Sequence, residues 1–209
     1  MTINKRNLMP INLDNYKITG FYYTEGNYSF RKYLNIKKKD FKGSTPDLMA
    51  IMMNPGSSEP LNKENNGRVE TEAKPDHTQH QIIRTMEKFN LSYARILNLS
   101  DLREPKCMEF YKKIDQMNNE GINHSIFDKK RDDELINLYV KGVPVIYAWG
   151  VNKKLVSLAK SALLFTRTEN SIGWKKSNYD FAYYHPLPRS FMKQIEWYEN
   201  IDQIMKKAK

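Results

Sequence analysis

Three polar residues stand directly behind short apolar segments and are the side chains of this sequence best placed to do chemistry. Asn54 follows the apolar run 48–53, Asn98 follows 93–97, and His185 follows 179–184. If these segments are parallel strands, two amides and an imidazole meet at one edge of a sheet. Such a group can hold a planar polar ligand and stabilise negative charge as it develops. The alternative is that the three side chains only satisfy the hydrogen bonds of strand ends.

The residues after Asn54 fit a turn that a ligand can approach closely. Pro55 restricts the backbone, and Gly56 has no side chain to keep a ligand away from it. Asn-Pro-Gly is also among the commonest turn sequences, so the motif alone leaves a purely structural turn open. The interpretation as a site therefore depends on what the other segments bring to the same edge.

The elements that position these residues alternate between strands and helices. Short apolar runs closed by a chain-breaking residue are typical of buried strands, which we expect at 48–53, 93–97, 143–148 and 179–184. Helical patterns lie between and after them, at 105–117, 128–140, 152–164 and 190–207, and one more begins after Asp76. This order predicts an α/β fold, a three-layer αβα sandwich around a mainly parallel, four-stranded sheet.

The N-terminal part predicts a β-hairpin ahead of that sheet. Aromatic and β-branched residues recur over 17–24 and 28–36, on both sides of a turn at Gly26. We therefore divide the chain into an arm and hairpin, residues 1–46, packed on an α/β domain, residues 47–209. The polar segment 59–74 has no apolar period and is expected to be an exposed, mobile loop.

Basic and aromatic residues alternate in the second strand of the hairpin, where Arg31 and Lys32 lie between Phe30 and Tyr33. Such a pattern can follow a phosphate backbone while it offers rings for base stacking. The alternative is a hairpin that packs its rings on the domain and exposes its lysines. The chain as a whole has a formal charge of +10, which favours a polyanionic partner, although a lysine-rich solvated surface gives the same sum.

Several classes of protein are disfavoured by the composition. The single cysteine, Cys107, has no partner for a disulfide or a thiolate metal site, and we expect it to be inert and buried on a helix. His77 and His80 lie three residues apart but have no third ligand in view, so no metal is expected. Glycine-rich phosphate loops, long apolar spans and a signal peptide are missing from the sequence. We expect a cytoplasmic monomer without a cofactor or a membrane anchor.

Four motifs, in order, resemble those of the uracil-DNA glycosylase superfamily. They are Asn54-Pro55-Gly56-Ser57-Ser58, Ile96-Leu97-Asn98, Tyr147-Ala148-Trp149-Gly150 with Lys153, and His185-Pro186-Leu187-Pro188-Arg189. The chain is still more similar to a group known only as domain of unknown function 1643. That resemblance rests on Asn54-Pro55, Asp76 with Thr78, Asn98-Leu99 with Arg103, Trp149-Gly150, and His185-Pro186-Leu187.

The glycosylase resemblance implies a role for each matched residue. A nucleotide would be flipped out of DNA, with Asn54 positioning a water molecule, Asn98 reading the base edge and His185 stabilising the departing base. The base would also contact three further residues, Pro55, Gly56 and Trp149. The DNA strand would be contacted by four others, Ser57, Ser58, Lys153 and Arg189, the last in place of a leucine wedge.

Departures from the classical glycosylases indicate weak or lost catalysis. Asn54 replaces an aspartate, Gly56 replaces a tyrosine, Leu187 replaces a serine, and no aromatic residue lies between Ser57 and Lys88. We therefore expect a glycosylase-like protein with a degraded active site that binds DNA or an acidic protein that imitates DNA. The alternative is an active DNA glycosylase that removes a mismatched or modified base.

Overall fold

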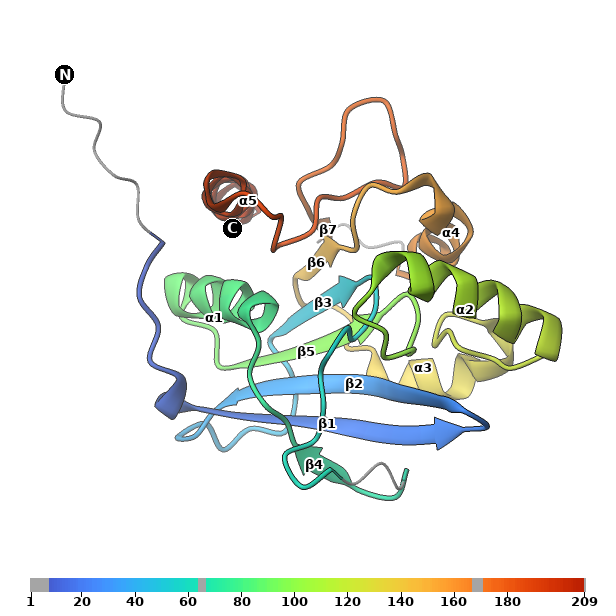
Figure 1. Ribbon diagram of the computed structural model, residues 1–209. Helices are drawn as coiled ribbons and strands as arrows, with labels where there is room; N and C mark the ends of the chain where they lie inside the picture. The colour runs from blue at the N-terminus through green and yellow to red at the C-terminus, as the bar shows by residue number, and fades with distance from the viewer. Residues whose placement is uncertain (1–7, 64–66, 167–170, 209) are drawn as a thin grey trace.

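The chain forms an α/β fold around one seven-stranded mixed sheet with the strand order β4-β1-β2-β5-β3-β6-β7 (Figure 1). The computed structural model describes residues 8–63, 67–166 and 171–208. The strands are β1 (Tyr16–Glu25), β2 (Tyr28–Lys38), β3 (Leu48–Met52), β4 (Glu70–Glu72), β5 (Tyr93–Asn98), β6 (Val145–Ala148) and β7 (Ser171–Ile172). The α-helices are α1 (His77–Phe89), α2 (Cys107–Glu120), α3 (Asp132–Leu138), α4 (Val156–Thr166) and α5 (Phe191–Lys207). None of these helices is both long and apolar enough to cross a membrane.

The strand β3 lies at the centre of the parallel half of the sheet. It pairs in parallel with β5 on one side and β6 on the other, and all five of its residues are buried. Because helices cover both faces, neither face of β3 needs polar side chains, which explains the uninterrupted apolar run. The chain leaves the sheet directly at Met53 and Asn54, so the predicted position of Asn54 at a strand end is correct.

The predicted hairpin is present but belongs to the sheet rather than packing on it. β2 runs antiparallel to β5, with Leu34 opposite Ile96, so the hairpin extends the parallel strands directly. The expected four-stranded, mainly parallel sheet is therefore wrong. Part of the expected loop is also ordered, because β4 pairs with β1 and buries Thr71 between two exposed glutamates.

The fourth expected strand, at 179–184, does not form. β7 takes its place as the parallel neighbour of β6, while Tyr183 makes only isolated bridges to Gly150 and Lys175. The alternation of rings in this segment serves packing instead, since Tyr183 lies edge-on against Trp149 with ring centres 5.2 Å apart. His185 therefore follows a loop rather than the end of a strand.

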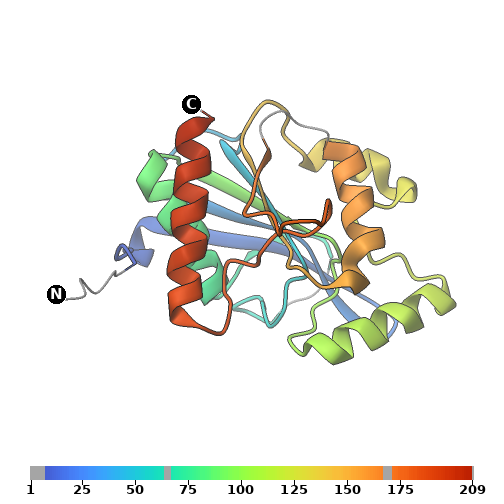
Figure 2. The same ribbon diagram turned by 90° about the horizontal axis from the view of Figure 1, so that it is seen from above.

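Two helical layers enclose the sheet, with α1 and α5 on one face and α2, α3 and α4 on the other (Figure 2). The first layer buries Ile82, Ile83 and Met86 of α1 together with Trp197 of α5. The second buries apolar residues of α2, α3 and α4 against the opposite face, including Phe110, Leu135 and Ala159. The predicted burial of Cys107 is wrong, because it is exposed at the start of α2, and Phe191 at the start of α5 is 54% exposed.

Candidate functional site

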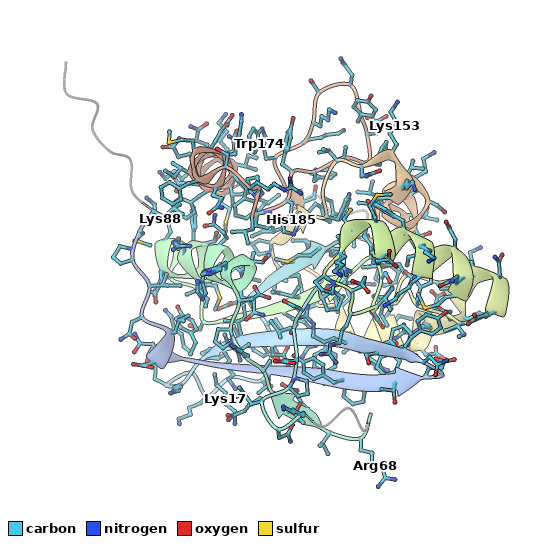
Figure 3. The ribbon with its side chains drawn as sticks, in the orientation of Figure 1. Lys17, Arg68, Lys88, Lys153, Trp174 and His185 are labelled. Atoms are coloured by element: carbon cyan, nitrogen blue, oxygen red, sulfur yellow. The ribbon has the colours of Figure 1, made fainter. Side chains whose placement is uncertain are left out.

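A cavity of about 360 Å³ lies where β3 ends, beside the beginning of α1. Several parts of the chain meet there: the end of β3 with the turn after it, the first residues of α1, the loop before α5, one residue each of β2 and β5, and Pro105. The lining residues used below are Arg31, Met52, Asn54, Gly56, Ser57, Asp76, Ile96 and His185. His185 is half-buried and lies above the sheet in the view of Figure 3. The structure thus brings Asn54 and His185 to one cavity, together with Pro55, Gly56 and Ser57.

The amide of Asn54 is held by the backbone that follows β5. Its Nδ2 donates hydrogen bonds to the carbonyl oxygens of Leu102, at 3.1 Å, and Glu104, at 2.7 Å. A side-chain amide has two N–H groups, so both are used and only Oδ1 remains to meet a ligand. Asn54 therefore fixes the loop 102–104 beside the cavity in addition to lining it.

His185 presents a neutral ring to the cavity. The backbone N–H of Leu187 donates to its Nδ1 at 3.1 Å, which places the remaining proton of the neutral ring on Nε2. Burial lowers the pKa of His185 to about 4, although the nearby Asp76 carboxylate opposes the shift. At neutral pH the ring is therefore an uncharged hydrogen-bond donor through Nε2.

Arg31 forms the floor of the cavity, and Asn98, which does not line the cavity, is hydrogen-bonded to Arg31. The Nη2 of Arg31 donates to Oδ1 of Asn98 at 3.1 Å, and the two residues are only 4% and 2% exposed. Asn98 lies opposite Met52 in the β3–β5 ladder, so it is placed between Arg31 and Met52, both of which line the cavity. Within the described residues, Nε of Arg31 and Nδ2 of Asn98 have no hydrogen-bond partner.

The start of α1 contributes a carboxylate. Asp76 is the N-cap of this helix: one of its oxygens accepts from the backbone N–H of Gln79 at 2.8 Å and the other from Nε2 of Gln79 at 3.0 Å. The predicted start of a helix directly after Asp76 is confirmed. Gln81, one turn further along, donates to the carbonyl oxygen of Pro186 at 3.1 Å and so ties the His185 loop to α1.

Five residues singled out from the motifs, Asn98 among them, lie outside the lining of this cavity. Trp149 is fully buried on the opposite face of the sheet, where its Nε1 donates to the Phe181 carbonyl oxygen at 2.7 Å. Ser58 is buried too, and its hydroxyl bonds to that of Tyr22 at 2.9 Å. Lys153 lies on the surface, far from His185 (Figure 3).

Arg189 is exposed and lines a neighbouring cavity of about 520 Å³ instead. His77 and Leu187 line both cavities, so the two adjoin. In the part of the chain that the structure describes, no three histidine, cysteine or acidic side chains come together as a metal site. The rings of His77 and His80 face each other edge-on, 5.2 Å apart.

Arg31 is a cavity residue that sequence reasoning did not identify. The basic and aromatic pattern suggested a side chain that faces a phosphate backbone, but the structure buries the guanidinium under the cavity. The register of β2 against β1 passes from Tyr33 to Arg31 and skips Lys32, which is a bulge. A bulge reverses which residues face inward, and no local sequence signal marked it.

Comparison with known proteins gives the chain a family. The sequence matches the family described as "Protein of unknown function (DUF1643)" over residues 33–187, which include the second half of β2 and all the cavity residues named above except Arg31. No curated protein and no solved structure matches the sequence. The match covers well over half of the chain, and the chain therefore belongs to the DUF1643 family.

Proposed function

We propose that this chain is a DNA-binding protein related to the uracil-DNA glycosylases, with a degraded active site, and that its cavity admits a base extruded from DNA. The observation that carries the proposal is the convergence of Asn54 and His185 on one cavity of about 360 Å³. This volume lies in the usual range of small-molecule pockets. The same two residues carry the motif resemblance, and their convergence agrees with the roles that it implies.

The chemistry of the cavity supports binding more strongly than hydrolysis. Attack on a glycosidic bond needs a group that orients and deprotonates water, and Asn54 offers only its amide Oδ1, which accepts a hydrogen bond but does not take up a proton as a carboxylate does. His185 can donate a hydrogen bond to a ligand oxygen, but it carries no charge near neutral pH because burial lowers its pKa to about 4. Asn54 is thus a weaker base than an aspartate would be. The neutral ring of His185 stabilises a departing anion less than an imidazolium would.

The surroundings of the cavity suit a polyanionic chain. The adjoining cavity is lined by Arg84 and Arg189 and by Phe191, whose ring is 54% exposed. Guanidinium groups pair with phosphates, and an exposed ring can stack on a base. With the net charge of +10, these residues favour DNA as the partner. An acidic protein that imitates DNA would compete for the same surface.

One observation favours the second candidate, an active glycosylase for a mismatched or modified base. The carboxylate of Asp76 lines the same cavity as His185, so a group able to accept a proton from water is present after all. Both oxygens of Asp76 already accept hydrogen bonds from Gln79, which makes the carboxylate less able to take a proton from water. We rank this candidate second for that reason.

The proposal is tested by blocking the mouth of the cavity. Ser57 is exposed and lines the cavity, so Ser57→Trp fills the entrance without changing the buried floor. Fluorescence anisotropy with labelled oligonucleotides should show affinity reduced about tenfold or more, the equivalent of about 1.4 kcal/mol. Gln116→Trp, on the exposed side of α2, is the matched control and should bind as the wild type does. Equal binding by all three proteins would contradict the proposal.

A further inference from the structure

The cavity of about 520 Å³ that adjoins the candidate site is built between α1 and the start of α5. One of its walls is a single face of α1, because the lining residues at 77, 80, 81 and 84 are three or four positions apart and so lie along one side of the helix. The other wall is made by residues 187–189 and by Phe191 and Gln194 of α5. His77 and Leu187 belong to both cavities, so the two share a boundary.

This second cavity carries positive charge without negative charge. Arg84 and Arg189 line it, and none of the described residues in its lining is acidic. The guanidinium of Arg84 is held in place, since its Nε donates to the Met9 carbonyl oxygen at 2.8 Å and its Nη1 to Oε1 of Gln81 at 3.2 Å. Its Nη2 is left for a ligand, and it is not among the described side-chain atoms that are buried without a partner. A guanidinium held in this way suits a phosphate group, which offers several acceptor oxygens.

Phe191 gives the same cavity an aromatic surface. Its ring is 54% exposed at the start of α5, although burial of a phenylalanine side chain is favourable. Leu187 and Pro188 add further apolar surface to the lining. Every base has a π-face, so stacking on an exposed ring tolerates any sequence. The second cavity thus offers what a nucleotide needs, a cation for its phosphate and a ring for its base.

Resting on the base-binding function proposed above, we infer that the second cavity takes the nucleotide next to the extruded one. Consecutive nucleotides are joined by a single phosphodiester, and two cavities with a common boundary fit such a pair. A duplex that extrudes one base keeps the neighbouring base paired and stacked, and unpairing that neighbour costs free energy. The preferred ligand is therefore DNA in which two consecutive nucleotides are already unpaired, as in a single strand or in a duplex with two bulged nucleotides.

Oligonucleotides of one sequence test this preference by fluorescence anisotropy. They are prepared as a single strand, as a duplex with two bulged nucleotides and as a duplex with one mismatch. We expect the single strand and the bulged duplex to bind the wild-type chain about tenfold or more tightly than the mismatched duplex, because stacking of one further base gives a gain of that order. Thymidine monophosphate is added as a competitor, since a cavity built for free nucleotides would have the same chemistry.

Phe191→Ala isolates the second cavity. Because the ring is exposed, its removal should leave folding intact, which thermal unfolding checks. Affinity for the bulged duplex should fall about tenfold, whereas affinity for the mismatched duplex should stay within about twofold of the wild type. Ile136→Ala is the matched control, since it removes an apolar side chain that is 63% exposed on α3, in the other helical layer. It should change neither affinity.

The outcomes separate this inference from the proposed function. Equal affinity for the bulged and the mismatched duplex, or a Phe191→Ala variant that binds both as the wild type does, overturns the second-nucleotide site while base binding in the first cavity stands. Thymidine monophosphate that displaces the bulged duplex as effectively as an unlabelled strand does overturns it in favour of a free nucleotide. If Phe191→Ala weakens binding of the bulged duplex and Ser57→Trp does not, the second cavity binds DNA and the extruded base of the proposed function is overturned.

Discussion

The side-chain amide of Asn54 joins two parts of the chain that are about fifty residues apart in sequence. Both of its N–H groups meet carbonyl oxygens, those of Leu102 and Glu104. This arrangement makes the amide irreplaceable by a carboxylate, although Asn and Asp have nearly the same shape. The departure from the aspartate of the classical glycosylases is thus coupled to how the neighbouring loop is held.

Replacing Asn54 by Asp is therefore expected to destabilise the protein rather than to create a catalyst. A carboxylate would face two carbonyl oxygens and leave both without their donors, at a cost of about 2–3 kcal/mol in the free energy of unfolding at pH 7. Urea unfolding measures this. Asn152→Asp is the control: its Oδ1 accepts from the backbone N–H of Lys154 at a helix start, where Asp serves equally well. Unchanged stability of Asn54→Asp would show that the amide is not a clamp.

His124 makes stability depend on pH at another buried position. Its ring is 4% exposed, with Nδ1 3.0 Å from the Ser100 hydroxyl, and burial lowers its pKa from 6.5 to about 4. A pKa lowered by folding stabilises the folded chain above pH 6.5, and this contribution is lost as the pH falls toward 4. The neighbouring Asp101 acts in the opposite direction, since burial raises its pKa to about 6 and so favours the folded chain at low pH.

The His124→Gln variant isolates the contribution of His124. Between pH 7 and pH 5 the wild-type chain should lose about 1–2 kcal/mol more unfolding free energy than the variant does. Urea unfolding at several pH values gives both curves, and their difference cancels the effects of Asp101 and His185. Parallel curves would mean that His124 is not held neutral by burial.

Among the elements, the β1–β2 hairpin positions Arg31 at the cavity, and its turn can be tested by mutation. Its turn has two residues between Glu25 and Tyr28, and the first, Gly26, has φ +56°. Positive φ at this position is expected of the tight turns that suit the twist of a hairpin. Gly26→Ala should reduce the unfolding free energy by about 1 kcal/mol, whereas Asn27→Ala, whose φ is not positive, should change it much less. Similar losses in both variants would contradict the turn assignment.

The elements that sequence patterns predicted are those with strong local signals. The run that forms β3, the turn at Gly26 and the Asp76 cap of α1 each depend on neighbours in sequence. β4 and β7 have three and two residues, too few for a periodic pattern, and they form because a partner strand lies beside them. In 179–184 the alternation was real, but the ring of Tyr183 packs on Trp149 instead of entering the sheet.

The candidate site likewise combines residues whose placement follows from local sequence with residues whose placement depends on distant parts of the chain. The convergence of Asn54 and His185 followed from their place behind apolar runs, and the structure brings both to one cavity. The motif alone suggested a binding role for Trp149. The side chain of Trp149 instead points to the face of the sheet opposite the cavity. Arg31 reached the floor through a bulge and a pairing between β2 and β5, both of which depend on the whole sheet.

At the scale of the whole molecule, DNA binding should depend on salt through the arginines beside the cavity. Arg189 is exposed and lines the adjoining cavity, and each phosphate contact contributes about one unit to the slope of log affinity against log salt. Arg189→Gln should lower that slope by about 1 in anisotropy titrations. Lys160→Gln, on the exposed side of α4, should leave the slope unchanged. The reverse pattern would place the DNA on a different surface.

The central claim is that the cavity binds an extruded base without cleaving it from its sugar. It is tested most directly by measuring binding and base excision on the same DNA. Oligonucleotides that carry uracil, mismatched thymine, hypoxanthine or modified cytosine are incubated with excess protein. Gel shift then reports binding, and alkali cleavage reports abasic sites. We predict a shift without cleavage, and no added cleavage when Asp76→Asn replaces the wild type. Abasic sites that appear with the wild type and disappear with Asp76→Asn or His185→Ala would contradict this account and make the protein an active glycosylase.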